Sequence, residues 1–511
     1  MITPPSVSAL VAFLDGPERE TRARVRAVLA EHDAAPVPGL DSEPHRQRVG
    51  DQLRLLAAEG LGRLAFPQSL GGAEDRAGHL AAVETLGHGD LSLMVAFGVQ
   101  FGLFAGSNVA GLRTVARYDT NEDALIVDTP DAGAAKAYIG GAPAARSAVV
   151  FARLVVDDED HGLHPLLVDL RDDHGRLLPG RHVEDCGPKA GLHGVGIGRI
   201  TFTGVRIPRE SLLDRFGGVN ADGKYTSPLD SPGERFAAML GTLLPGRVAV
   251  AGAALAATKT ALCIAIRYGE HRRQFAPADR PEQPILDYPT HQRRLLPALA
   301  AAYGLHFALR RAGREALAAF DEGRTGDDRR RVDALVAALK AAATWHAVDT
   351  VQVCREACGG RGYLADMRLG PLRADVDVFT TFEGDNTVLL QLTARSLLTD
   401  FRRQFEAASR QDLLRHLSRP LAARAATMGG ARRRVEDIAF QLDTLRWRER
   451  QMVAELGRRI QRRASAGRRW TRRSWPTRTL PLAPPGPTPI ASCSRASMTS
   501  SRNAPLTPGR S

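Results

Sequence analysis

The spacing of apolar residues divides this chain into three stretches that predict different secondary structure. Three- and four-residue spacing within residues 17–104 predicts helices at Glu18–Glu31, Glu43–Leu61, Ala73–Leu86 and Leu91–Leu103. Short apolar runs between turn residues within 107–215 predict strands at Arg113–Tyr118, Ala124–Asp128, Ser147–Val156, Leu166–Leu170 and Gly198–Phe202. Residues 232–400 return to long, alanine-rich patterns, which predict helices at Gly233–Tyr268, Thr290–Glu322, Asp328–Ala357 and Thr387–Phe401. Helices and strands in separate blocks predict an α+β fold, mainly α, with distinct domains.

The C-terminal part of the chain changes character near Arg462. Val435–Ile460 has an amphipathic helical pattern, whereas residues 461–511 contain ten Arg and no Asp, Glu or Lys. Because the whole chain carries +12, residues 1–460 carry only +2. The tail is rich in Pro, Ser and Thr and cannot bury enough apolar surface to order itself, so we expect disorder. A shifted reading frame would produce the same abrupt change. The tail lacks interleaved aromatic residues, so we expect no nucleic-acid partner.

Composition excludes several other classes of protein. The chain has 511 residues, of which 43% are hydrophobic and 25% charged, as in soluble globular proteins. The longest apolar stretch, Leu243–Ile266, is interrupted by Arg247 and Lys259, so no membrane span is expected. The N-terminus has no basic head before its apolar patch, and the five cysteines form no regular framework. These features predict a cytoplasmic protein. Cys354 and Cys358 are interpreted as buried thiols, and no metal site is expected.

The most informative motif lies between Cys354 and Gln391. A Gly-Gly pair interrupts a helical pattern, and Phe382-Glu383-Gly384 follows shortly after it. A carboxyl flanked by Phe and Gly, with no cation close in sequence, can occupy an apolar cleft. Its pKa would rise there, which suits it to remove a carbon-bound proton. The alternative interpretation of Glu383 is an acidic residue near the N-terminus of a helix that begins at Asn386.

Three segments together resemble the acyl-CoA oxidase and acyl-CoA dehydrogenase superfamily. They read CREACGGRGY with TFEGDNT, then RYGEHRRQFA, then PILDYPTHQ, and their wording is closest to the oxidase branch. The resemblance implies an acyl-CoA dehydrogenase-like fold, with an N-terminal helical domain, a middle β-barrel or sheet domain and a C-terminal helical bundle. The expected boundaries are 1–105, 106–216 and 230–402, followed by a truncated oxidase-type helical segment at 403–460 and the tail at 461–511.

The resemblance also implies a reaction and a cofactor. Removing hydrogen from two adjacent saturated carbons needs a base and a hydride acceptor, and no side chain accepts hydride, so FAD is expected. Glu383 would take the α proton of an acyl-CoA thioester, and the β hydride would pass to the flavin, giving a trans-2-enoyl-CoA in fatty-acid β-oxidation. The backbone N–H of Glu383 would stabilise the enolate-like charge. Phe382 and Gly384 would contact the substrate.

The residues expected to bind FAD follow from the same motifs. Arg272, Gln274 and Phe275 match a segment that reaches the pyrophosphate and adenosine from a neighbouring subunit, so a homodimer is expected. Glu356, Gly359 and Gly360 match a segment whose backbone approaches the cofactor. The other matching positions are Gln292, Ser107, Tyr138 and Ile139. Oxygen or an electron-transfer flavoprotein would accept the electrons.

One departure from the family pattern concerns the segment before Ser107. A Thr-Glu strand that lines the flavin in the family is missing, because the helical pattern that ends at Phe104 runs directly into Gly106-Ser107-Asn108. The loss of a central strand would remove flavin contacts and expose backbone groups. An inactive relative that only dimerises or binds acyl-CoA therefore stays open beside the enzyme. A basic interaction protein that uses its tail is the third alternative.

Overall fold

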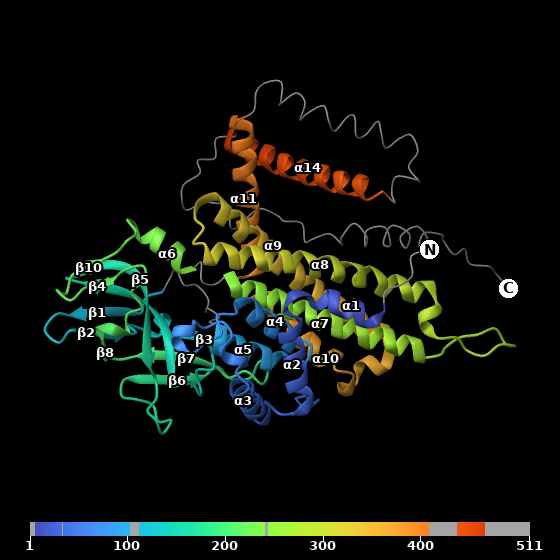
Figure 1. Cartoon of the computed structure of the whole chain (residues 1–511), viewed down its shortest axis with the longest axis horizontal. Coiled ribbons are helices and arrows are strands. Elements are labelled where there is room, and N and C mark those ends of the chain that lie inside the picture. Colours follow the sequence, from blue (N-terminus) through green and yellow to red (C-terminus); the bar gives the residue numbers. More distant parts are fainter. Residues whose placement is uncertain (1–5, 33, 103–111, 241–243, 408–436, 466–511) are drawn as a thin grey trace, which may run out of the picture. The chain divides into compact units, whose positions relative to one another are not determined.

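The computed structural model describes residues 6–32, 34–102, 112–240, 244–407 and 437–465. Contacts between Cα atoms divide the chain into one unit of Met1–Leu389 and another of Leu390–Ser511. Within the first unit, helices come first, strands follow, and long helices return (Figure 1). This order confirms the predicted α+β, mainly helical fold. The predictions for Ser107 and for a strand missing before it fall on residues 103–111, outside the described residues, as does most of the tail.

Side-chain caps mark the start of two of the N-terminal helices. The side chain of Ser6 accepts a hydrogen bond from the backbone N–H of Ala9 at 3.2 Å, and Asp75 accepts one from Gly78 at 2.7 Å. Such caps satisfy backbone donors that have no partner in the first turn. The helices are α1 (Val7–Asp15), α2 (Arg19–Glu31), α3 (Ser42–Ala58), α4 (Arg76–Leu86) and α5 (Leu91–Gly102).

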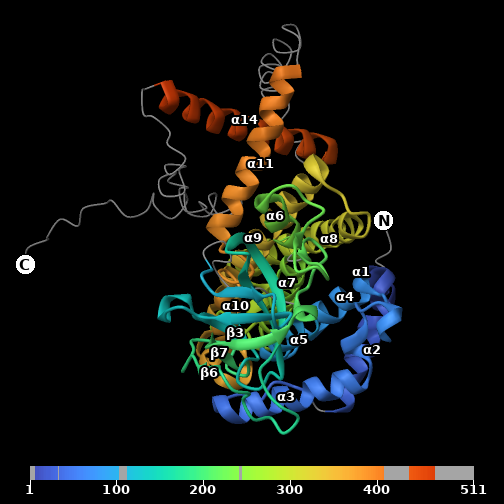
Figure 2. The same ribbon diagram turned by 90° about the vertical axis from the view of Figure 1, so that its left-hand side faces the viewer.

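The middle region contains three small sheets. The five-stranded sheet has the order β5-β4-β1-β2-β8, with β1 and β4 parallel and the other pairs antiparallel. The second sheet has the order β3-β7-β6, which Figure 2 shows as neighbours, and the third pairs β10 with β9. The strands are β1 (Val115–Asp119), β2 (Ala124–Asp128), β3 (Lys136–Gly140), β4 (Ser147–Val156), β5 (Glu159–Asp169), β6 (Arg181–Asp185), β7 (Ile197–Phe202), β8 (Val205–Pro208), β9 (Gly218–Val219) and β10 (Tyr225–Thr226).

Alternating side chains give these strands a core of their own. Burial alternates along β2 and β4, as expected where one face of a strand is covered. The buried side chains form one cluster, which includes Leu125, Val127, Leu154, Leu166 and Phe202.

Helices form most of the rest of the first unit. They are α6 (Pro232–Leu240), α7 (Leu244–His271), α8 (Pro289–Asp321), α9 (Gly326–Ala357) and α10 (Leu369–Val378), and α11 (Asn386–Ala407) starts here. Helices α7, α8 and α9 pack side by side (Figures 1 and 2). Among the described helices, α7 alone is long and apolar enough to cross a membrane, but 72% of its apolar window is buried. That burial is typical of a core helix.

The structure differs from the sequence-based predictions at several elements. The helix predicted at Gly233–Tyr268 is described as two helices, α6 and α7. Pro245 lies in the first turn of α7, where its missing N–H costs nothing, so the second helix can begin there. Helices α1 and α10 and strands β3, β6, β8, β9 and β10 were not predicted.

A loop between β6 and β7 connects the strands to the helices of the first unit. The N–H of Leu192 donates to Asp375 Oδ1 on α10 at 2.6 Å, and the N–H of Gly194 donates to Ser92 Oγ on α5 at 3.1 Å. A Cβ atom at Gly191 would meet the backbone of Ala374. The two backbone segments therefore approach too closely for a side chain at position 191.

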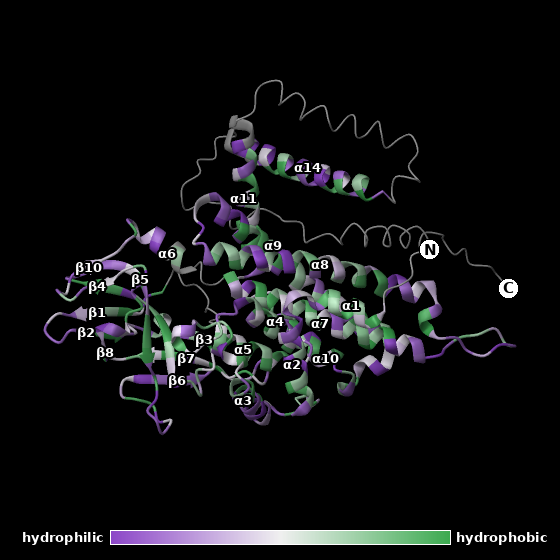
Figure 3. Ribbon diagram, in the orientation of Figure 1, coloured by the Kyte–Doolittle hydropathy of each residue, from purple (hydrophilic) through white to green (hydrophobic). Residues whose placement is uncertain are grey.

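The described part of the second unit consists of most of α11 and of α14 (Ile438–Ser465). Figure 3 shows hydrophobic and hydrophilic residues alternating along α14. This agrees with the amphipathic helix predicted at Val435–Ile460. Large apolar side chains stay exposed on it, including Ile438, Leu445 and Met452.

Candidate active site

Glu383 lies in a tight turn between α10 and α11. Its φ is +53° and that of Gly384 is +103°, so both residues are in the left-handed region. The side chain of Leu389 lies 3.0 Å from the position that a Cβ would take at Gly384. Only 7% of Glu383 is exposed, and the neighbouring Phe382 ring lies 5.3 Å from the buried ring of Phe379. The turn therefore places a carboxyl group inside the protein next to an aromatic pair.

Two cations from distant helices lie around this turn. Arg247 on α7 donates from Nε to the carbonyl oxygen of Glu383 at 3.4 Å, and Lys340 on α9 donates from Nζ to that of Gly384 at 2.8 Å. Burial lowers the pKa of Lys340 to about 8, while Glu383 and Asp385 act to raise it. Burial likewise lowers the pKa of Arg247, and Glu383 opposes this shift.

These cations correct the environment that the sequence predicted for Glu383. The carboxyl is buried, as expected, but it does not occupy a cleft without positive charge. The attraction that raises the pKa of Lys340 acts equally on the Glu383 carboxylate and favours its charged form. The local sequence could not indicate this, because Arg247 and Lys340 are far from Glu383 along the chain.

A second group of predicted residues lies at the other end of α7. The Tyr288 hydroxyl donates to the carbonyl oxygens of Gln274 at 3.0 Å and Phe275 at 2.8 Å. Gln292 belongs to the same structure, because its N–H donates to the Tyr288 carbonyl at 3.0 Å and its side chain to Leu286 at 3.0 Å. Arg272 is exposed directly after α7. Residues 272–288 thus form one hydrogen-bonded loop, and Gln292 lies in the first turn of α8 directly after it.

The end of α9 lies beside this loop. Arg294 Nη2 contacts Glu356 Oε2 at 3.1 Å, and Gln352 donates to the other Glu356 oxygen at 2.6 Å. Gly359 and Gly360 follow in an exposed 3-10 helix, and a Cβ at either would meet nothing within 4 Å. Gly359 has φ of +58°. The backbone is therefore open on this side, and a bulky group can approach it.

The two groups of residues are far apart within one chain. Arg247 and His271 are 24 residues apart on α7, which at 1.5 Å per residue is about 36 Å. Lys340 and Glu356 on α9 are separated by about 24 Å on the same basis. One chain therefore does not bring Arg272, Gln274 and Phe275 to Glu383.

The third predicted group is on the small sheet. Tyr138 and Ile139 lie in β3, where Ile139 pairs with Gly198 of β7 and packs against the sheet core. Tyr138 points outward, with 70% of its surface exposed. Gly140, two residues after Tyr138, lies against Val99 of α5.

Backbone strain coincides with three of the predicted residues. Tyr138, Phe275 and Glu383 all have positive φ, at +63°, +62° and +53°. The left-handed region is a genuine outlier for bulky side chains, and such strain is concentrated at functional sites. Tyr138 and Phe275 are also strongly exposed, at 70% and 67%. Neither aromatic is thus held in place by burial in a core.

The chemistry of these residues fits a flavin dinucleotide. Exposed aromatic rings can stack on adenine or isoalloxazine, and the guanidinium of Arg272 suits a pyrophosphate. Open glycine backbone at Gly359 and Gly360 allows close approach. The side chain of Gln292 is already bonded to Leu286, so its expected contact with the cofactor would require it to share or exchange that bond.

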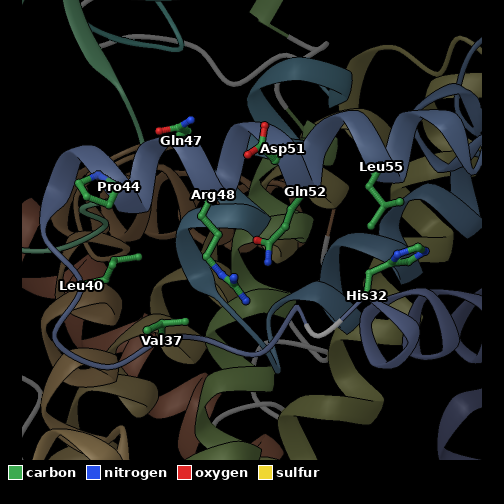
Figure 4. A pocket seen from close by; sticks show the side chains of 9 residues that line it. All are labelled: His32, Val37, Leu40, Pro44, Gln47, Arg48, Asp51, Gln52 and Leu55. Atoms are coloured by element: carbon green, nitrogen blue, oxygen red, sulfur yellow. The ribbon is translucent and has the colours of Figure 1, made fainter.

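Two hollows of the first unit lie apart from Glu383. A groove of about 500 Å³ runs between α3 and the loop after α2, and Figure 4 shows Arg48 and Gln52 pointing into it from α3. A smaller cavity of about 70 Å³ is lined by residues of α2, α4, α7 and α8. Glu383 lines neither of them.

Sequence reasoning missed the polar residues that hold the Glu383 turn. Lys340 is fully buried, and Nζ also donates to Asn386 Oδ1 at 3.0 Å. The signal that could have identified it is a single lysine in the apolar stretch Ala334–Ala343, since lysine is almost never fully buried without a partner. Arg247 was noted only as an interruption of an apolar run.

Comparisons with known proteins support one family. The acyl-CoA oxidase C-alpha1 domain model matches residues 240–398. The peroxisomal acyl-coenzyme A oxidase 2 of Arabidopsis thaliana is 38% identical over 444 residues, which covers 76% of this chain and 63% of that protein. Acyl-CoA oxidase 1 of Yarrowia lipolytica has a similar structure, with a TM-score of 0.68, 29% identity, and coverage of 79% of this chain and 65% of the other. Acyl-CoA oxidase-1 of Caenorhabditis elegans, solved with FAD and ATP, has a TM-score of 0.63 and 26% identity, covering 76% and 63%.

The prediction of a cytoplasmic location is wrong by these comparisons. The plant relative is named a peroxisomal enzyme, and so is acyl-coenzyme A oxidase 3 of Homo sapiens, which is 44% identical over 314 residues and covers 58% of this chain and 45% of that protein; these names point to the peroxisome instead. The prediction rested on cysteine usage and on the N-terminus, which report a reducing environment and the lack of a secretory pattern. Neither feature distinguishes the cytoplasm from the peroxisome, because proteins of both compartments lack a secretory signal.

The chain spans somewhat less than two thirds of the length of the plant relative. Over that span, the motifs around Cys354–Gln391, the order of helices and strands, the family model and the solved structures all agree. These comparisons therefore all support the acyl-CoA oxidase branch of the acyl-CoA oxidase and acyl-CoA dehydrogenase superfamily as the family to which the matched part of the chain is similar.

Proposed function

We propose that this protein carries out the FAD-dependent α,β-dehydrogenation of acyl-CoA thioesters to trans-2-enoyl-CoA. The observation that carries the proposal is the position of Glu383, a buried carboxylate on a strained turn beside two cations. In this role Glu383 removes the α proton of the thioester. Phe382 and Gly384 border the acyl group, and the backbone N–H of Glu383 donates to the thioester oxygen, where negative charge develops.

The environment of Glu383 supports this role in a specific way. A general base must be ionised before it accepts a proton, and the charges of Arg247 and Lys340 favour that form. Hydrogen bonds to the enolate then stabilise the charge that develops as the α proton, a weak acid, is removed.

FAD is the proposed cofactor, and when bound it would accept the β hydride. Tyr138 and Ile139 would contact the flavin, and Arg272, Gln274 and Phe275 would hold its pyrophosphate and adenosine, with Gln292, Glu356, Gly359 and Gly360 beside them. Because Arg272, Gln274 and Phe275 lie at the far end of α7 from Glu383, we propose that a second copy of the chain supplies these three residues. The protein would accordingly act as a homodimer.

Molecular oxygen is the proposed electron acceptor. The support for it is the family, because the relatives are named oxidases. An electron-transfer flavoprotein is the alternative acceptor, and an assay can separate the two: peroxide forms under air only if oxygen reoxidises the cofactor. The same assay, repeated with a series of acyl-CoA chain lengths, also identifies the preferred substrate.

The experiment is a comparison of wild type with Glu383→Gln. The wild type should purify with a flavin spectrum that bleaches when acyl-CoA is added without oxygen. The substitution keeps the shape of the side chain and removes the base, so turnover should fall by about 10²–10⁴-fold while FAD is retained. Glu322→Gln, on an exposed side chain after α8, is the matched control and should keep full turnover.

Two results would contradict the proposal. Unchanged turnover in the Glu383→Gln protein would exclude that residue as the base. A wild-type protein that stays colourless when FAD is added, but still binds acyl-CoA, would instead identify an inactive relative.

A further inference from the structure

Lys340 is the most unusual charged residue near the proposed base. It lies in the middle of α9, and none of its surface is exposed. Removing an ammonium group from water is unfavourable unless hydrogen bonds replace the lost hydration. Nζ donates to the Gly384 carbonyl at 2.8 Å and to Asn386 Oδ1 at 3.0 Å. Both partners belong to the turn that carries Glu383.

Lys340 is one part of a polar clamp on that turn. Thr344 lies one helical turn further along α9, and its hydroxyl accepts a hydrogen bond from Asn386 Nδ2 at 2.9 Å. The N–H of Asn386 donates to the Thr380 carbonyl at 3.0 Å. Residues 380–386 therefore form a closed loop whose end is fixed on α9, and Glu383 is in the middle of that loop.

The clamp acts where the backbone is strained. Glu383 and Gly384 both have positive φ, which a flexible turn would relax. The hydrogen bond from Lys340 is made to the carbonyl of Gly384, directly after Glu383. Arg247 makes a longer contact, 3.4 Å, to the carbonyl of Glu383 itself. Lys340 thus makes the shorter bond to this pair of residues.

The ionisation of Lys340 depends on its burial and on three charged neighbours, Arg247, Glu383 and Asp385. The pKa of Lys340 is lowered to about 8, mainly by burial and also by Arg247, while Glu383 and Asp385 oppose the change. The lysine therefore loses its proton at mildly alkaline pH. Its charge near the Glu383 carboxylate is lost at the same time, and its bonds to Gly384 and Asn386 weaken, because a neutral amine is a poorer donor.

We propose that Lys340 is a positioning residue for the dehydrogenation: its ammonium holds the Glu383–Gly384 turn in its left-handed conformation and provides positive charge to the carboxylate. The proposal rests on the function proposed above. It assigns to Lys340 no contact with the substrate. Its effect on the reaction passes through the placement and the charge of Glu383, so it should change kcat much more than KM for the thioester.

The test measures kcat and KM between pH 6 and 10 for the wild type and four variants. Lys340→Met fills the same space without charge, and its kcat should fall by about 10²-fold, as for a base displaced by about 1 Å. Lys340→Arg keeps a charge that persists at every pH tested. Thr344→Val loosens the clamp and keeps the lysine. Lys224→Met, on an exposed lysine, is the control.

The pH profile distinguishes positioning from a purely structural role. In the wild type, kcat should fall as pH rises through about 8, because Lys340 then becomes neutral. This decrease should be absent in Lys340→Met, whose kcat is low throughout, and absent over the tested range in Lys340→Arg, whose charge persists. Thr344→Val should lower kcat and keep the decrease near pH 8. Lys224→Met should match the wild type.

The outcomes separate this inference from the function on which it rests. If the wild type turns over acyl-CoA but its kcat shows no decrease between pH 7 and 10, the role of Lys340 is refuted and the proposed function stands. Equal kcat in wild type and Lys340→Met refutes it too. If the wild type neither reduces its flavin nor forms product, both proposals fall. If Lys340→Met does not fold, the pH dependence of kcat in the wild type, in Lys340→Arg and in Thr344→Val still tests the role of Lys340.

Discussion

Glu84 gives the sharpest stability prediction, because it is a buried carboxylate that ties four helices together. Only 8% of it is exposed on α4. One oxygen accepts from Arg22 Nη2 of α2 at 2.7 Å, and the other from Lys259 Nζ of α7 at 3.0 Å. His306 Nδ1 of α8 lies 3.8 Å from the same oxygen as Lys259. The perturbation is Glu84→Gln, which keeps the volume and removes the charge.

The magnitude follows from the ionisation of the carboxyl. Burial by itself raises the pKa of Glu84, but Lys259 and Arg22 more than offset this, so the pKa falls from 4.5 to about 2. A shift of this size corresponds to about 3 kcal/mol of stability. Because the folded-state pKa is the lower one, this contribution is complete above pH 4.5. It is lost as pH falls from 4.5 toward 2.

At pH 7, Glu84→Gln should therefore lower the free energy of unfolding by about 3–5 kcal/mol, since it leaves the buried Arg22 and the half-buried Lys259 without their carboxylate partner. The assay is thermal and urea unfolding of both proteins at pH 7 and at pH 3. The difference between them should shrink at pH 3, where the wild-type Glu84 has lost part of its advantage. Glu322→Gln, an exposed member of an ion pair with Arg324, should show no measurable change. A difference that is equal at both pH values, or absent at pH 7, would refute the reasoning.

Two further predictions concern other buried groups. Burial raises the pKa of Asp375 to about 6, so its ionisation costs stability as pH rises from 3.8 through 6; Asp375→Asn should raise the free energy of unfolding at pH 8 by about 1–2 kcal/mol and leave it nearly unchanged at pH 4. A loss of stability at pH 8 would contradict this. Burial raises the pKa of the Cys354 thiol to about 12 and that of Cys358 to about 11, whereas Cys186 and Cys263 are exposed. Alkylation mapped by mass spectrometry should modify the two exposed thiols in the native protein and the two buried ones only in denaturant; equal rates at all four would show that the α9 core is open.

The sequence predicted the long elements well, because each buries one continuous apolar face. Helix α9 extends over Gly326–Ala357 where Asp328–Ala357 was expected, and β2 and β4 have the predicted bounds. The short strands were missed because KAYIG, RHVED and VRIP contain too few alternating apolar positions to be distinguished from loops. Helix α10 was missed because Gly370 and Pro371 in its first turn read as a turn signal.

For the site, the chain by itself determined which residues to examine, since the motif around Glu383 is local and continuous. Only tertiary structure decided the environment of that residue. Arg247 and Lys340 lie 136 and 43 positions away in sequence, and the packing of α7 and α9 brings them to one turn. The same packing separates Glu383 from Arg272 by the length of α7. Coulomb interactions depend on distance in space, so no pattern along the sequence contains either result.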